Sequence, residues 1–290
     1  MAAPTTVQKG LDYTLSISGG TEIGGGTNAT LTLSQELSES TNKSSSAFKS
    51  SQNGTRSWSV DFEGMYIESS VELAGDSLDF KVGSSSGTGG VSVKGIREIT
   101  LDLSSELIGS VSSTTGLDRA ICPATRTVSM TINGEWYDFD KDLTPTGGDE
   151  ALEDLFDEIQ GTTSSGIECT LTFGASQKIY ATLRPTAFTL EHPHNDIITY
   201  SVTLEATGAV TAPTTTGADS GVVALLTDFF TSGGAAEVGT ALLSTGTTDA
   251  TEYTGSAYPE SLSLSIPYTG VIALSGTLQG SGALTMQATT

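Results

Sequence analysis

The sequence has few of the residues that catalytic and metal-binding sites most often use. Its 290 residues include two cysteines, Cys122 and Cys169, and two histidines. The cysteines have neither a CxxC spacing nor a histidine cluster beside them, so we expect buried thiols rather than a metal site or a disulfide. No GxSxG, HExxH or phosphate-binding loop is present. These absences predict a protein that is not an enzyme and that uses no cofactor.

Positive charge is scarce as well. Lys and Arg number 12 against 34 Asp and Glu, which gives a net charge of -22, and no Lys or Arg follows Arg184. A surface that grips phosphates concentrates Lys and Arg on one face, so binding of nucleic acid by attraction is disfavoured. The simplest interpretation of this acidic excess is that it provides solubility.

Long apolar stretches are also missing. The N-terminus, MAAPTTVQKG, does not have the basic region and apolar run of a secretory signal. The apolar runs elsewhere are far shorter than a membrane span. We therefore expect a chain that is made in the cytoplasm and is not inserted in a membrane.

Ser, Thr and Gly dominate the composition, and apolar residues occupy every second position in several short runs. The run SWSVDFE at 57–63 has this alternation, and it recurs at 127–133, 187–191 and 261–266. A period of two predicts strands with one face on a core and the other facing water or a neighbour. The sequence therefore predicts a mainly β fold.

The first half of a folding unit is present twice. The stretch 31–66, which begins LTLSQEL, aligns without gaps onto 101–136, which begins LDLSSEL, and Arg56 aligns with Arg126. Upstream, GLDYTLSIS near the N-terminus resembles SLDFKVGSS from Ser77. The two arginines occupy matching places, and a structural ion pair with a carboxylate is the favoured interpretation of each.

The second half of the unit is also present twice. RPTAFTLEHP from Arg184 matches YPESLSLSIP from Tyr258, and SVTLEATGAVT from Ser201 matches SGTLQGSGALT from Ser275. The order of halves suggests that one domain is inserted into a loop of another. The predicted domains are 76–213, inserted, and 1–75 together with 214–290. An interlocked pairing of the halves is the alternative, and it needs more crossing connections.

Each unit also has one segment with apolar residues at helical spacing. These segments are ALEDLFDEI from Ala151 and VVALLTDFF from Val222, and Gly161 and Gly233 follow them as stop signals. The predicted architecture is a small β-sandwich or partly open barrel with one flanking α-helix, present twice, with one copy nested in the other.

The sequence resembles the major tail tube proteins of siphoviruses, the long-tailed bacteriophages. The Gly-rich start, LTLSQEL, the polar segment ESTNKSSSAFKSSQNGTRSW and then SVDFEG resemble the N-terminal half of that family. IYATLRPTAFTLEHPHNDIITYSVTLEATGAV resembles its C-terminal half. The resemblance implies domains whose sheets join into rings, and rings that stack into a tube for viral DNA. Since family members usually have one domain and form hexameric rings, two domains per chain imply a trimeric ring.

The resemblance also implies partners and surfaces. The partners are further copies of the chain and the tail terminator, tail tip and tape measure proteins, all within the virion, while DNA passes without specific binding. The polar segments 38–54 and 108–124 would reach the adjacent ring. Their candidate residues are Ser44, Phe48, Lys49, Thr114, Asp118 and Arg119.

Two further predictions concern pairs of residues. Asp61 and Glu63 are candidates for the tube lumen, with the tube exterior or an interface as the alternative. His192 and His194, in HPHND, have a spacing that suits a metal, but Pro193 favours a turn there. The competing functions are another virion β-protein, such as a head decoration or tail tip component, and a surface adhesin or carbohydrate-binding module.

Overall fold

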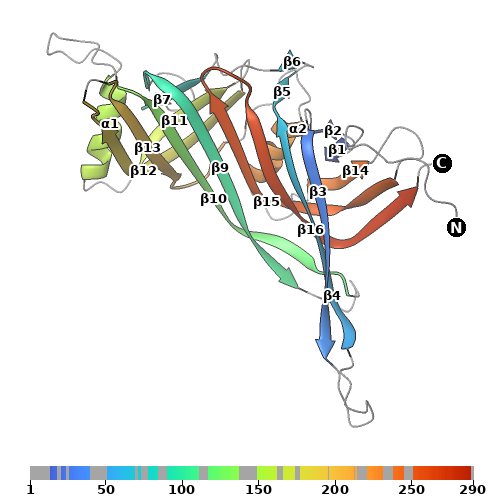
Figure 1. Cartoon of the computed structure of the whole chain (residues 1–290). Coiled ribbons are helices and arrows are strands. Elements are labelled where there is room, and N and C mark those ends of the chain that lie inside the picture. The colour runs from blue at the N-terminus through green and yellow to red at the C-terminus, as the bar shows by residue number, and fades with distance from the viewer. Residues whose placement is uncertain are drawn as a thin grey trace.

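The computed structural model describes most of the chain (Figure 1). The described residues are 14–17, 21–23, 26–39, 51–68, 71–72, 78–83, 90–110, 117–136, 149–161, 166–173, 177–194, 196–211, 213, 221–230, 238–244 and 251–288. In this part of the chain no helix is both long enough and apolar enough to cross a membrane.

Two sets of elements make up the fold. The outer set, from the two ends of the chain, contains β1 (Thr14–Ile17), β2 (Thr21–Glu22), β3 (Gly26–Glu39), β4 (Ser51–Met65), α2 (Gly221–Phe230), β14 (Val238–Ser244), β15 (Thr251–Pro267) and β16 (Ala273–Ala288). The inner set, from the middle, contains β7 (Asp79–Val82), β8 (Val91–Ser92), β9 (Ile96–Ser110), β10 (Ala120–Glu135), α1 (Asp149–Gln160), β11 (Ile167–Phe173), β12 (Gln177–Glu191) and β13 (Thr199–Ala206). The short strands β5 (Ile67–Glu68) and β6 (Val71–Glu72) pair only with each other.

The other strands form one open antiparallel sheet of 14 strands, so the prediction of a mainly β fold with two flanking helices is confirmed. Within the outer set the order is β3, β4, β16, β15, β14, β1, β2. Within the inner set it is β9, β10, β13, β12, β11, β7, β8. Each strand of one set thus has a counterpart at the same place in the other.

The irregularities of the two sets also correspond. A bulge between Gly26 and Asn28 of β3 matches one between Ile96 and Glu98 of β9. The bulge after Pro185 in β12 likewise matches the bulge after Pro259 in β15. Counterparts differ by 70 in residue number for β3 and β9, and by 74 for β12 and β15. Because bulges fix strand register, each residue of one set has a defined counterpart in the other.

The core lies on one face of this sheet. Every second side chain of the central strands is buried there, and the two helices add apolar residues to the same core cluster. In the four central strands these buried side chains include Trp58, Val60, Phe62, Ile99, Leu101, Leu103, Val128, Met130, Ile132, Leu262, Leu264 and Ile266. The predicted alternation of the strands therefore has its apolar side on the core, as period-two patterning requires.

The two cysteines are both free thiols. Cys169 is buried, and burial raises the pKa of its thiol to about 12. Cys122 is exposed, so the expectation of two buried thiols is wrong for this residue. Cys122 pairs with Ile108 in the part of the β9–β10 hairpin that extends past the core, where Ile108 is itself exposed.

Candidate assembly surfaces

Among the described residues, one strand ladder, between β15 and β9, joins the two sets within the sheet. Residues 261–267 of β15 pair antiparallel with residues 98–104 of β9. Three apolar pairs meet on the core face of this ladder, and all six side chains are at most 2% exposed. They are Leu262 with Leu103, Leu264 with Leu101, and Ile266 with Ile99. Burying one such side chain stabilises the fold by about 1.5–3 kcal/mol, so this ladder, called here the internal joint, is a strong contact.

The counterparts of these two strands are unpaired at the same places. Among the described residues, β3 pairs only with β4, and residues 187–191 of β12 pair only with β13. On β3, Leu33 is 65% exposed, whereas its counterpart Leu103 is 2% exposed. On β12, Leu190 is 37% exposed, whereas its counterpart Leu264 is 1% exposed. The chain therefore has two open edges that repeat, on separate strands, the two sides of the internal joint.

The helices differ in the same way. On α2 every described apolar position except Ala224 and Phe230 is buried, and Phe229 packs under Arg126 of β10, with the guanidinium carbon 5.8 Å from the ring centroid. That contact spans the internal joint from one set to the other. On α1, near the open edge of β12, Phe156 is 44% exposed and meets Phe188 edge-on at 5.5 Å. Apolar surface is thus left uncovered beside the open edge.

The opposite face of the sheet is polar and acidic. Asp61 and Glu63, the candidate lumen residues, are both exposed on it, beside a shallow depression that also contains Asp102. Three carboxylates of this face accept a hydrogen bond from a hydroxyl group of the neighbouring strand. These are Asp61 from Thr277 at 2.7 Å, Asp102 from Ser263 at 2.6 Å, and Glu98 from Ser265 at 2.7 Å. These hydrogen bonds orient three carboxylates on the polar face of neighbouring strands.

The β9–β10 and β3–β4 hairpins extend from the same side of the sheet (Figure 1). At the end of the first, Asp118 forms a two-point ion pair with Arg56 of β4, with nitrogen to oxygen distances of 3.0 and 3.2 Å. The backbone adds contacts: Arg56 N–H donates to the Leu117 carbonyl, Arg119 N–H to the Arg56 carbonyl, and Gly282 N–H to the Arg119 carbonyl. The inner hairpin therefore crosses the outer set and ends on β4 and β16.

The predicted inter-ring residues divide into two groups. Ser44, Phe48, Lys49 and Thr114 lie outside the described residues. Asp118 and Arg119 contact β4 and β16 of their own chain. A role for any of these residues between rings stays a prediction.

Comparison with known proteins gives a likeness to tail components, at low similarity. No protein-family model and no curated protein matches the chain. A chain from the tail of an empty GTA particle, computed with C6 symmetry, is 18% identical with a TM-score of 0.38, over 49% of this chain and 98% of that one. For the SPP1 tail tube the identity is 11% and the TM-score is 0.35, over 47% of this chain and 76% of that one. For a chain from the virion of a native gene transfer agent the identity is 13% and the TM-score is 0.24, over 72% of this chain and 100% of that one. Similarity this low assigns neither a family nor a function.

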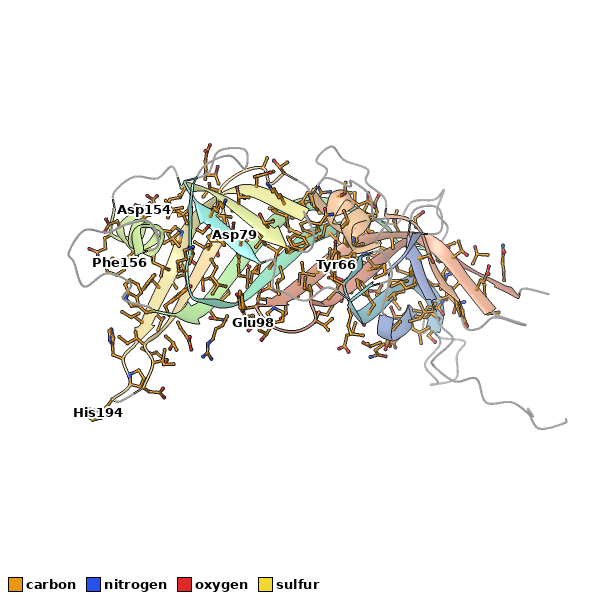
Figure 2. All side chains as sticks on the ribbon, turned by 90° about the horizontal axis from the view of Figure 1, so that it is seen from above. Tyr66, Asp79, Glu98, Asp154, Phe156 and His194 are labelled. Carbon is orange, nitrogen blue, oxygen red and sulfur yellow. The ribbon has the colours of Figure 1, made fainter. Side chains whose placement is uncertain are left out.

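The histidines lie in the turn that follows β12. His192 and His194 are both exposed, and Figure 2 shows His194 at the end of this turn, away from Asp154 and Phe156 of α1. Among the described residues no group of three or more His, Cys, Asp and Glu side chains is placed to hold a metal ion.

The open edges of β3 and β12 were not predicted from the sequence. The alternation at 261–266 and at 187–191 looks the same in the sequence, yet one strand is paired on both sides and the other has an open edge. The available signal was the internal repeat: aligning the four half-units places His192 where Ile266 stands, and Ala29 where Ile99 stands. These two differences in sequence distinguish the open edges from the internal joint.

Proposed function

We propose that the chain is a structural protein of a viral tail, in which three copies close into a ring and rings stack into a tube for viral DNA. The outer and inner sets act as two copies of one tube domain, the inner one inserted into the outer. The observation that carries the proposal is the internal joint, because its two sides recur as open edges on β12 and β3. The open β12 of one copy then pairs with the open β3 of the next, as β15 pairs with β9 within the chain.

A closed ring is the arrangement that leaves neither of these edges open. Because the two edges differ from each other, the contact between copies is head-to-tail. Repeating this contact leaves no edge open only when the copies close into a circle. Eight strands of each chain lie on the path from β12 to β3, and three copies give a barrel of 24 strands. With strands about 4.8 Å apart and tilted by about 35–45°, such a barrel is about 45–50 Å across, which is wider than a double helix.

The polar face supports the assignment of the lumen. The core face carries both helices and so faces outward in this ring, which turns the face of Asp61, Glu63, Glu98 and Asp102 inward. Carboxylates along the wall repel the phosphates of DNA, so that a genome passes without binding. The two hairpins, which extend from one side of the sheet, then project toward the adjacent ring (Figure 1).

Electron microscopy of the purified chain tests the ring. We expect rings or hollow tubes with three chains and six quasi-equivalent domains per ring, and raised salt should favour stacking because it screens the negative charge. Rings of six chains would contradict the stoichiometry. Protein that stays monomeric at every salt concentration, even with short tube fragments added as seeds, would contradict the tube itself.

Cross-linking tests the pairing residue by residue. The counterparts of Ser263 and Asp102, which pair in the internal joint, are Thr189 and Thr32. In a Cys122→Ser background, Thr189→Cys with Thr32→Cys should form disulfides between chains, because opposed residues of an antiparallel pair lie within disulfide reach. Ser263→Cys with Asp102→Cys is the matched control, and it should close within one chain. Thr189→Cys with Asn28→Cys is out of register and should not cross-link; equal yields from both Thr189 pairs would contradict the proposed register.

A further inference from the structure

The internal joint and the proposed joint between copies differ at one position in a way that changes their chemistry. In the internal joint Ile266 faces Ile99, and both side chains are fully buried. The counterpart of Ile266 is His192, and the counterpart of Ile99 is Ala29 on β3. Pro193 matches Pro267 directly after this position. β12 ends at Glu191, the counterpart of Ser265, whereas β15 continues through Ile266 and Pro267, which pair with β9.

We propose that, at the joint between copies, His192 of one copy packs against Ala29 of the next, and that this joint closes fully only when the imidazole is neutral. The inference rests on the ring proposed above. Its occupant is fixed by the chain's own repeat: a second copy supplies β3 with the same bulge and the same alternation that β9 supplies within the chain. Ala29 leaves room for the longer, planar side chain of histidine at the place where two isoleucines meet in the internal joint.

On the core face, the surroundings of this contact on the β3 side are apolar or uncharged. The carboxylates of Asp61 and Glu63, which flank Phe62 on the neighbouring β4, lie on the opposite, polar face. Ala29 is half-buried, belongs to the edge of the core cluster, and lies opposite the buried Phe62 of β4. At the internal joint the neighbouring position is occupied by the ion pair of Arg97 with Glu135. The counterparts of that pair on β3 and β4 are Thr27 and Met65, so a positive imidazole there meets no compensating carboxylate from them.

Charged groups on the β12 side are few near this end of the strand. Glu191 precedes His192 and points to the opposite, polar face, and His194 and Asp196 lie in the turn that follows. Asp196 already accepts a hydrogen bond from the Ile197 N–H at 2.8 Å. The described carboxylates of α1 are Asp154, Asp157 and Glu158, and Figure 2 shows the turn at His194 extending away from Asp154. The adjoining residues of β13, which begins at Thr199, are uncharged.

Protonation of His192 therefore opposes closure. Histidine normally changes its charge near pH 6.5, and putting the charged ring between apolar strands is unfavourable. The sign follows: the closed joint disfavours the charged ring, so closure weakens as the pH falls through the range in which histidines ordinarily gain a proton. The association constant of each joint should fall by up to about tenfold per pH unit below that range.

The experiment measures ring formation by the full chain from pH 5 to 8 at constant ionic strength, with mass photometry as the readout. Wild-type rings should be lost progressively below about pH 6.5. His192→Ile, which restores the residue of the internal joint, and His192→Gln, which removes the charge alone, should both give pH-independent closure over that range. His194→Gln is the matched control, since it changes the only other histidine, and it should keep the wild-type profile.

The outcomes separate the two proposals. Rings whose pH profile is flat in wild type, or unchanged by both His192 variants, overturn the His192 contact and leave the ring standing. A profile abolished by His194→Gln overturns it as well. The absence of rings from every variant at every pH overturns the ring, and the contact with it.

Discussion

In the outer set the indole of Trp58 fills space that two glycines leave open, whereas in the inner set three smaller side chains fill the same space. A Cβ atom on Gly280 would lie 2.1 Å from the indole Cδ2, and one on Gly255 would lie 2.5 Å from Cζ2. The counterparts of these three residues are Val128, Ala206 and Ala181. Each half keeps its core filled, but by a different division of volume between facing strands.

The same exchange occurs four residues further along β4. Phe62 faces Gly276 in the outer set, and their counterparts Ile132 and Val202 face each other in the inner set. A Cβ on Gly276 would lie 2.9 Å from Cζ of Phe62. The comparison teaches that the two halves conserve register and bulges, while the core side chains have changed in compensating pairs.

The strongest test of the difference between the two sets places one lysine at matching positions of the internal joint and of the open edge. Leu264→Lys puts an unpaired ammonium into the internal joint, and it should destabilise the fold by more than about 4 kcal/mol. Leu190→Lys makes the same change on the open edge, where the side chain is 37% exposed, so the chain should fold normally but no longer form rings. Urea unfolding and mass photometry measure the two effects.

Leu103→Lys and Leu33→Lys provide the same test on the facing strands. Leu103 is 2% exposed and Leu33 is 65% exposed, so the contrast should be the same or larger. Loss of folding in Leu33→Lys or Leu190→Lys would show that these edges are already buried within a single chain, and would remove the basis for pairing between copies.

A smaller effect should come from exchanging the volumes of the two cores. Gly280→Ala forces a methyl group against Trp58 and should lower the free energy of unfolding by about 1–3 kcal/mol. The triple variant Trp58→Val, Gly255→Ala and Gly280→Ala reproduces the residues of the inner set and should recover much of that loss. Urea titration gives both values, and a triple variant less stable than Gly280→Ala would contradict the compensation.

The sequence predicted the secondary structure well, for a physical reason that is visible in particular strands. Trp58, Val60 and Phe62 alternate with polar residues, and that period is set by the strand itself. The helices at 151 and 222 followed in the same way from their apolar spacing. The exposure of Cys122 was missed because the chain does not indicate where a long hairpin leaves the core.

The joining of the two sets was not predictable from alternation. Leu264 and Leu190 both lie between polar residues and have the same parity, but only the first has a partner strand on both sides. Pairing between distant strands depends on which edges meet in space, and that information is spread over the whole chain. The same holds for the glycines around Trp58, whose role is clear only when the facing strands are in place.

The smallest predicted effect compares the two helices. Asp228 of α2 is partly buried, and loss of contact with water raises the pKa of its carboxyl group, whereas Asp157 of α1 is exposed. Because the folded state holds this proton to higher pH than the unfolded state, Asp228 lowers stability as the pH rises past the ordinary carboxyl range. Asp228→Asn should therefore raise the melting temperature at pH 7 more than at pH 4, and Asp157→Asn should have little effect at either pH. Equal gains at both pH values would contradict this assignment.

The internal joint also affects the kinetics of assembly. Two domains in one polypeptide meet at an effective concentration that the connecting chain sets, whatever the dilution of the protein. A ring of three chains then needs two bimolecular encounters in place of five, and at equilibrium its concentration rises with roughly the third power of the free chain concentration rather than the sixth. Dilution or pulling would open such a ring at the β3–β12 seams alone, because separating β15 from β9 requires a chain to unfold.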